Sequence, residues 1–151
     1  MREIRKMKDR YLFKAKRLDN GEWVKGALVY DNMDKLYRII IELDYSTGTC
    51  IRAGKAPRVD ASTICQYTGL KDKNGKLIWE NDVIAYWDTY STESGLAEAD
   101  CVGQVVWDDE KMSFQVTNRL SAESYEVLDE CSVIGNIFDN PELLESEEAG
   151  R

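Results

Sequence analysis

The sequence predicts an all-β fold, because several short strand-like runs alternate along it with turn signals. Asn74-Gly75 is the clearest signal, since both central residues of a type I′ hairpin turn need positive φ and Asn-Gly tolerates this best. Asp19-Asn20-Gly21 is a second signal of the same kind. The runs between turns are rich in β-branched and aromatic residues, which favour strands. The expected architecture is a barrel or sandwich of short antiparallel hairpins.

Three strands are expected before the central hairpin, and they are Tyr11–Leu18, Trp23–Tyr30 and Tyr37–Leu43. The third is β-branched and apolar, which is typical of a buried strand. Ala56–Asp60 is expected to be extended, because Pro57 biases the residue before it away from helix.

The central hairpin has Leu70 before its turn and Leu77 and Ile78 after it. Charged residues are expected to keep the tip in water, and these are Lys71, Asp72, Lys73 and Lys76. Glu80-Asn81-Asp82 is expected to form a tight turn with positive φ at Asn81, because Asn is the commonest residue other than Gly in that region. Asp82 is expected to accept backbone hydrogen bonds of this turn.

The remaining chain predicts more strands and one short helix. Val83–Trp87 is expected as a core strand and Ser91–Asp100 as an exposed loop. Further strands are expected at Cys101–Trp107, Ser113–Thr117, Tyr125–Leu128 and Cys131–Phe138. Asn140-Pro141-Glu142 has the form of a helix start, with a cap, a proline at the first helical position and an acid in the first turn. One domain is expected over residues 1–144, followed by a disordered tail at 145–151.

The composition describes a soluble globular protein, with 43% hydrophobic and 32% charged residues. No apolar run approaches the roughly 20 residues of a membrane span, and Met1–Arg10 lacks the apolar centre of a signal peptide. A cytoplasmic location without membrane contact is therefore expected. The net charge of −8 disfavours binding to phosphate. The Lys- and Arg-rich first 60 residues leave a basic N-terminal face open as an alternative.

Catalytic and metal-ligating residue types are scarce. Histidine is absent, which excludes Cys-His and Ser-His nucleophiles. The four cysteines have no paired spacing, so small, buried and reduced thiols without zinc are expected at Cys50, Cys65, Cys101 and Cys131. Carboxylates in Asp108-Asp109-Glu110, and Glu80 with Asp82, are the catalytic candidates that stay open, although neighbours in a turn usually face solvent. We therefore expect no catalytic residue, cofactor or metal.

Four tryptophans lie on or beside expected strands, at Trp23, Trp79, Trp87 and Trp107. Strand-borne tryptophan most often packs in a core or between strands. One or two exposed tryptophans would suit a protein-binding surface, because tryptophan is enriched in interface hot spots.

The run Gln66–Ile84 resembles the signature of the YopX family of phage and prophage proteins, Q-Y-T-G-L-K-D-K-N-G-K-x-I-[aromatic]-E-G-D-[IV], with Asn81 in place of the usual Gly. Val59–Ile64 resembles the family's lead-in V-D-P-S-T-[VI], and Val133–Leu144 resembles its closing V-I-G-N-I-[YF]-x-N-P-E-L-L. The resemblance covers most of the chain. It implies a mainly β pseudobarrel with a short C-terminal helical turn. Its signature residues, expected to be structural, are Tyr67, Thr68, Gly69, Leu70, Asn74, Gly75, Glu80, Asp82, Gly135, Asn136, Asn140 and Pro141.

The resemblance implies a phage or prophage protein, in the cytoplasm of a bacterial host, whose molecular function is uncharacterised. Because catalytic residue types are scarce, we expect a non-enzymatic protein-interaction module, with a homo-oligomer as one form of it. One alternative is a nucleic-acid-associated phage protein, which would use a basic N-terminal face or mimic DNA with an acidic one. A carboxylate-based enzyme is a third and less favoured reading.

Overall fold

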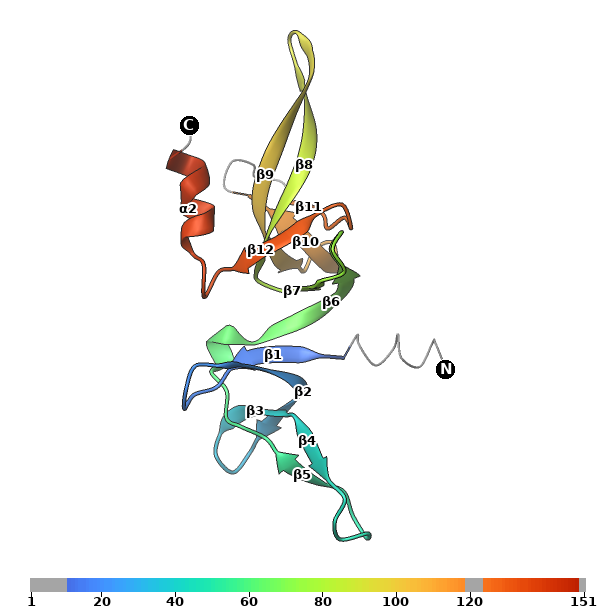
Figure 1. The fold of residues 1–151 in the computed structure, drawn as a ribbon, viewed down its shortest axis with the longest axis vertical. Coiled ribbons are helices and arrows are strands. Elements are labelled where there is room, and N and C mark those ends of the chain that lie inside the picture. The colour runs from blue at the N-terminus through green and yellow to red at the C-terminus, as the bar shows by residue number, and fades with distance from the viewer. Residues whose placement is uncertain (1–10, 119–123, 150–151) are drawn as a thin grey trace. The chain divides into compact units, whose positions relative to one another are not determined.

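The computed structural model describes residues 11–118 and 124–149 of the chain (Figure 1). Strands dominate these residues, and the sheets are antiparallel. The all-β prediction is therefore confirmed. The chain divides into two compact units, Met1–Tyr67 and Thr68–Arg151. The expectation of a single domain over residues 1–144 stays a prediction.

The first unit is built on a sheet with the strand order β3-β2-β1-β6. Its strands are β1 (Phe13–Lys16), β2 (Trp23–Asp31), β3 (Leu36–Ile40) and the start of β6 (Cys65–Lys71). A separate ribbon pairs β4 (Glu42–Asp44) with β5 (Arg52–Lys55), and the 3₁₀ turn η1 (Ala61–Thr63) precedes β6. The single strand expected over Tyr37–Leu43 is interrupted at Ile41. There the Ile41 amide donates to the Lys55 carbonyl at 2.9 Å, so the chain leaves β2 and joins β5.

The core of the first unit is small. Ala15, Ile39 and Val59 are buried at its centre. Around them pack partly buried side chains, namely Phe13, Val24, Leu28, Tyr37 and Ile64. Val59 reaches this core through the extended segment expected at Ala56–Asp60, which pairs through isolated bridges with Arg17 and Arg38.

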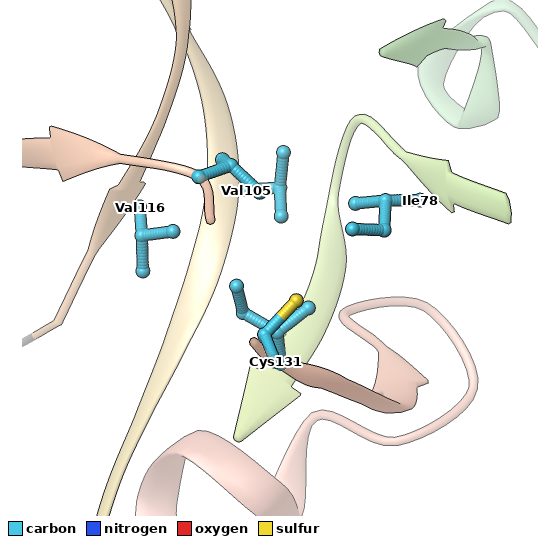
Figure 2. Close-up of a cluster of buried hydrophobic side chains, with 6 residues drawn as sticks. Ile78, Val105, Val116 and Cys131 are labelled. Carbon is cyan, nitrogen blue, oxygen red and sulfur yellow. The ribbon is translucent and has the colours of Figure 1, made fainter. Parts of the chain in front are cut away.

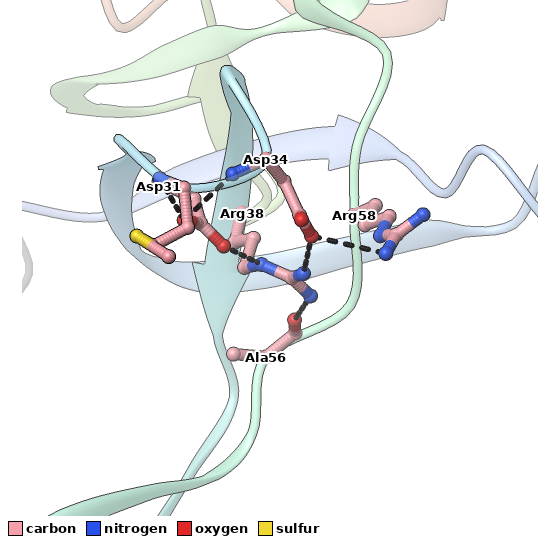
Figure 3. Close-up of polar contacts among 6 residues, drawn as sticks. Asp31, Asp34, Arg38, Ala56 and Arg58 are labelled. Atoms are coloured by element: carbon pink, nitrogen blue, oxygen red, sulfur yellow. Dashed lines mark hydrogen bonds and ion pairs between the residues drawn. The ribbon is translucent and has the colours of Figure 1, made fainter.

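A polar network closes the β2–β3 turn of the first unit (Figure 3). The Arg38 guanidinium donates to the Asp31 carboxylate at 2.7 Å, to the Asp34 carboxylate, and to the Ala56 carbonyl at 3.0 Å. Arg58 forms a second ion pair with Asp34 at 3.0 Å. Asp31 also accepts the backbone N–H groups of its own turn, and the Arg38 bond is the main reason that the pKa of Asp31 is lowered. The forked guanidinium therefore holds three segments at once.

The second unit contains a sheet with the strand order β11-β10-β9-β8-β12. These strands are β8 (Asp82–Thr92), β9 (Gly95–Asp108), β10 (Ser113–Thr117), β11 (Ser124–Glu126) and β12 (Ser132–Asn136). The end of β6, β7 (Leu77–Trp79) and helix α2 (Glu142–Ala149) complete the unit. Among the residues that the structure describes, no helix is long and apolar enough to span a bilayer.

The core of the second unit gathers side chains from strands that are distant in sequence (Figure 2). Its buried members are Ile78, Ile84, Val105, Val116, Val127 and Cys131. Register explains the grouping, because Val105 pairs with Val116 across β9 and β10 and partners share a face. Each fully buried aliphatic side chain contributes about 1.5–3 kcal/mol relative to an exposed one.

The central hairpin forms where expected, but its turn is not type I′. Gly75 has φ +81, whereas Asn74 is not among the residues with positive φ. The Asp72 carbonyl accepts the Gly75 N–H at 3.0 Å, and the Asp72 N–H donates to the Lys76 carbonyl at 2.8 Å. This pattern is a type I turn followed by a left-handed glycine, the usual three-residue hairpin loop. The prediction of a type I′ turn was wrong, because Asp72 occupies the first position of a type I turn, where aspartate is favoured.

The exposed loop expected over Ser91–Asp100 is instead a long hairpin, drawn in yellow in Figure 1. β8 and β9 pair without interruption from Val83 with Gln104 to Thr92 with Gly95. The loop was predicted from the small polar side chains of this segment. The strands instead form through hydrogen bonds between backbone groups, which do not depend on those side chains. The turn of this hairpin lies at Glu93-Ser94.

The C-terminal helix begins where expected. Pro141 immediately precedes α2, and Glu142 lies in its first turn. The helix continues to Ala149, past the point at which the sequence analysis placed the start of a disordered tail. Residues 150 and 151 lie outside the described residues.

Candidate functional site

The signature residues of β6 and the central hairpin are part of the framework. Tyr67 is buried, and the Thr68 hydroxyl donates to the Ile78 carbonyl at 2.7 Å, which ties β6 to β7. The same hydroxyl oxygen accepts the Leu70 N–H at 3.2 Å. Gly69, between them, has φ +87, a conformation that favours glycine. These contacts brace the end of β6 against β7.

Asp72 is the polar residue whose role the sequence analysis missed. It is 6% exposed, although we expected it to keep the hairpin tip in water. Its carboxylate accepts the N–H groups of Asn74, Lys76 and Val133, each at 2.9 Å. The Lys73 N–H also donates to the Cys131 carbonyl at 3.0 Å. The hairpin is thereby fastened to the start of β12, and the Val133 bond is the main cause of the lowered pKa of Asp72.

The turn at Glu80-Asn81-Asp82 has the expected form. Asn81 has φ +69, and the Asp82 carboxylate accepts the Trp79 N–H at 2.8 Å, as predicted for both residues. Asp82 is only 2% exposed. Asn81 makes a further bond that the sequence did not indicate, in which its side-chain oxygen accepts from Gln104 Nε2 at 3.1 Å.

The closing signature forms a compact corner between β12 and α2. The Asn136 side chain accepts the N–H groups of Phe138 and Asp139 at 3.0 and 2.9 Å. Asn140 returns a bond, with its side-chain oxygen accepting the Asn136 N–H at 3.3 Å. A Cβ on Gly135 would lie 2.5 Å from that same oxygen, so any other residue would require the Asn140 side chain to move. Pro141 follows and leads into α2.

Two of the carboxylate candidates, Asp108 and Asp109, accept hydrogen bonds from residues in or next to their own turn. The Asp108 side chain accepts the N–H groups of Glu110 and Lys111 at 2.9 and 3.0 Å, and the Lys111 bond is the main cause of its lowered pKa. Asp109 accepts from the Trp107 indole at 2.8 Å. A carboxylate with a lowered pKa is a poor general base or acid at neutral pH. Within residues 11–118 and 124–149, no three Cys, Asp or Glu side chains are grouped to hold a metal ion.

The cysteines occupy different environments. Cys65 and Cys131 are buried, Cys101 is half-buried and Cys50 is exposed, and all four are free thiols. Burial raises the pKa of Cys131, whereas a hydrogen bond with Arg52 lowers the pKa of Cys50. The expectation of buried thiols therefore needs correction at Cys50, because the β4–β5 connection places it on the surface.

A basic strip lies on one side of β1 and β2. Lys14 pairs with Lys25, and Lys16 pairs with Trp23, so alternation directs these four side chains to the same face. The Lys14 and Lys16 ammonium groups lie 4.6 and 5.5 Å from the centre of the Trp23 ring. These distances are typical of cation–π contacts. The basic strip matches part of the basic N-terminal face that the sequence left open.

The second unit contains a pocket of about 350 Å³. Its lining comes from β8, β10, β11 and the segment before β12, and comprises Ile84, Tyr86, Trp87, Asp88, Val116, Tyr125, Glu126, Leu128, Glu130 and Cys131. This volume lies at the small end of the range for ligand pockets, which is about 300–1,000 Å³. The lining is mainly apolar, so we treat it as the candidate binding site.

The register explains how the pocket forms. Tyr86 shares a face of β8 with Ile84 and lies over Gly103, where an added Cβ would be 2.6 Å from Val116 and 3.3 Å from the Tyr86 ring. The Tyr86 hydroxyl accepts from Asn118 Nδ2 at 3.0 Å. Val116 pairs with Tyr125 on β11, which brings that ring to the same side.

The pocket has a buried base and an exposed mouth. Ile84, Val116 and Cys131 at the base are between 1% and 3% exposed. At the mouth, Tyr125 is 42% and Leu128 is 63% exposed. Trp87 is also exposed, but alternation along β8 directs its side chain away from that of Tyr86. An apolar group entering the pocket would therefore cover surfaces that water now contacts.

Acidic residues border the pocket. Asp88, Glu126 and Glu130 line it, whereas no Lys or Arg does among the described residues. The surrounding unit has the same sign. Thr68–Arg151 carries 6 of the 20 basic and 19 of the 28 acidic residues, a net charge of −13, whereas Met1–Tyr67 carries the other 14 and 9, a net charge of +5.

Comparison with known proteins agrees with the fold. Among solved structures, the chain is similar to the crystal structure of protein EF1440 from Enterococcus faecalis, with a TM-score of 0.57 and 28% sequence identity. That match covers 87% of this chain and 96% of the other. A search of curated proteins found no match. The family model described as YopX protein matches residues 12–145. Since this match spans most of the chain, the protein belongs to the YopX family.

Proposed function

We propose that this protein is a non-enzymatic, phage- or prophage-encoded module that binds another protein in the bacterial cytoplasm. The pocket of the second unit supports this proposal most directly. It joins a buried apolar base to an exposed aromatic and aliphatic mouth at Tyr125 and Leu128. Such an arrangement suits an apolar anchor side chain of a partner, because anchors buried in pockets contribute most of the binding energy at protein interfaces.

Two further observations favour binding over catalysis. Two of the carboxylates named as catalytic candidates, Asp82 and Asp108, accept backbone hydrogen bonds of turns. The signature residues of the family brace strands and corners. The chemistry available around the pocket is therefore contact with apolar and charged groups.

A capture experiment with matched variants tests the proposal. The tagged protein is expressed in the bacterial host as wild type, Leu128→Ser and Leu96→Ser, and the bound proteins are compared. Leu96 is 80% exposed on β9 and does not line the pocket, so it controls for the loss of an exposed leucine. We expect a partner that Leu96→Ser retains and Leu128→Ser loses. Identical bound proteins for all three forms would contradict the proposal.

Nucleic-acid binding is a second candidate, and the basic strip of Lys14, Lys16, Lys25 and Trp23 favours it. Proteins that bind single-stranded nucleic acids combine basic side chains, which contact the phosphate backbone, with aromatic rings, on which the bases stack. Electrophoretic mobility shifts at about 50 mM salt provide the test, because low salt favours electrostatic binding. Retardation of single-stranded or duplex DNA at micromolar protein, abolished by Lys14→Glu with Lys16→Glu, would replace the protein-binding proposal with this one.

A further inference from the structure

We infer that the pocket selects a cationic partner segment, in which one apolar side chain enters the pocket and a neighbouring Lys or Arg meets its acidic border. This inference rests on the proposed function and adds the chemistry of the partner. It commits to a peptide segment of another protein as the occupant.

The size of the pocket limits what enters it. About 350 Å³, closed at the base by Ile84, Val116 and Cys131, accommodates a large side chain but not a folded element. Tyr86 is held over this base by its bond from Asn118 and by the absence of a side chain at Gly103. The shape of the base is therefore fixed before a ligand arrives, which lowers the cost of binding.

Charge complementarity determines which flanking residues the partner needs. Asp88 and Glu130 lie at the border, no described basic side chain lines the pocket, and the unit around it carries a net charge of −13. An acidic segment would meet repulsion at close range, whereas a cation gains attraction both at the border and over longer distances. A neutral apolar segment would gain only the contact in the pocket.

The experiment selects binders without assuming their sequence. A display library of random peptides is selected on immobilised full-length protein, and the peptides retained on Leu128→Ser are subtracted, because they do not use the pocket. We expect the remaining peptides to share an aromatic or aliphatic residue flanked by Lys or Arg. Pocket-dependent peptides that are neutral or acidic would overturn this inference and leave the proposed function standing.

Charge variants then measure the border directly with one synthetic peptide from the selection. Glu130→Lys is compared with Glu93→Lys, an exposed glutamate in the β8–β9 turn that does not line the pocket. We expect Glu130→Lys to weaken binding severalfold, up to about tenfold, because it removes an exposed ion pair with the peptide and adds a repulsion. Glu93→Lys should have a much smaller effect. Raising salt from about 50 to about 500 mM should weaken wild-type binding and reduce the difference between the variants.

Two results would count against the inference in different ways. Equal affinities for both variants, with no salt dependence, would show that the pocket recognises the peptide through apolar contact alone and that its acidic border does not contribute. If no pocket-dependent peptide is selected, the inference fails. The capture experiment with Leu128→Ser then decides separately whether the proposed function fails as well.

Discussion

Asn81 holds a left-handed backbone at the junction of two elements. Its N–H donates to the Val105 carbonyl at 2.7 Å, and its carbonyl accepts from Ile137 at 3.1 Å, so the turn cannot relax without breaking contacts to β9 and the C-terminal corner. The left-handed conformation costs a residue with a Cβ about 1–2 kcal/mol. Asparagine offsets part of that cost through the bond from Gln104 to its side chain.

The first prediction compares two replacements of Asn81. Asn81→Ala should lower the free energy of unfolding by about 2 kcal/mol, because it combines a strained backbone with the loss of the Gln104 bond. Asn81→Gly should cost about 1 kcal/mol less than Asn81→Ala, because it removes the strain and loses only that bond. Urea unfolding of both variants measures the difference. Equal stabilities would show that positive φ is not required at this position.

The second prediction concerns Asp72 and acid. Its folded pKa is lowered, so its contribution to stability is present above the unfolded pKa of about 3.9 and is lost as the pH falls through the folded value. Asp72→Asn should destabilise the protein by about 2–3 kcal/mol at neutral pH, because three backbone donors lose a charged acceptor. The variant should also lose stability less steeply below about pH 4.

Unfolding measured between neutral and acidic pH tests the Asp72 prediction. Asp129→Asn, at an exposed position of the same unit, is the control and should follow the wild type. If the stability of Asp72→Asn fell with acid as steeply as that of the wild type, protonation of Asp72 would not contribute to the loss of stability at low pH.

At the scale of elements, the central hairpin is defined by what surrounds its turn. Asp72 satisfies N–H groups of its own turn and of Val133, and so joins the hairpin to β12. Asp72 also favours the type I turn, in which only Gly75 needs a positive φ. An isolated Asn-Gly pair would instead place it on both residues.

The third prediction distinguishes these two turns. Asn74→Ala should change the free energy of unfolding by less than about 0.5 kcal/mol, because Asn74 has an ordinary φ. Gly75→Ala should cost about 1–2 kcal/mol, because its φ of +81 penalises a Cβ. Chemical denaturation of the two variants is sufficient. If both variants lost a similarly large amount of unfolding free energy, the type I′ turn would be the correct assignment.

At the scale of the whole molecule, the chain carries charge of opposite sign in its two units and distributes its cysteines between surface and core. The buried thiols at Cys65 and Cys131 pack as small apolar side chains. Cys50 has a different environment, since it is exposed in the β4–β5 connection, and Arg52 lowers its pKa.

The fourth prediction is an order of thiol reactivity across the chain. Thiolate is the reactive form, so Cys50 should react first with iodoacetamide at neutral pH and should become faster as the pH rises towards its pKa. Cys65 and Cys131 should react only after denaturation. Peptide mapping by mass spectrometry after timed labelling measures the order. Native labelling of Cys131 as fast as that of Cys50 would show that the core of the second unit opens readily.

Local chemistry in the sequence determined much of this protein. Asn-Gly and Asn-Pro signals located turns and the helix start, β-branched runs located strands, and the preference of asparagine for left-handed backbone identified Asn81, because these effects act between near neighbours in the chain. The family signature likewise lies in contiguous motifs. The tertiary structure decided what depends on distant partners. It buried Asp72 against Val133, extended β8 and β9 through backbone pairing, and assembled the pocket from residues between Ile84 and Cys131. No local pattern encodes these features, because each is a contact between segments that only folding brings together.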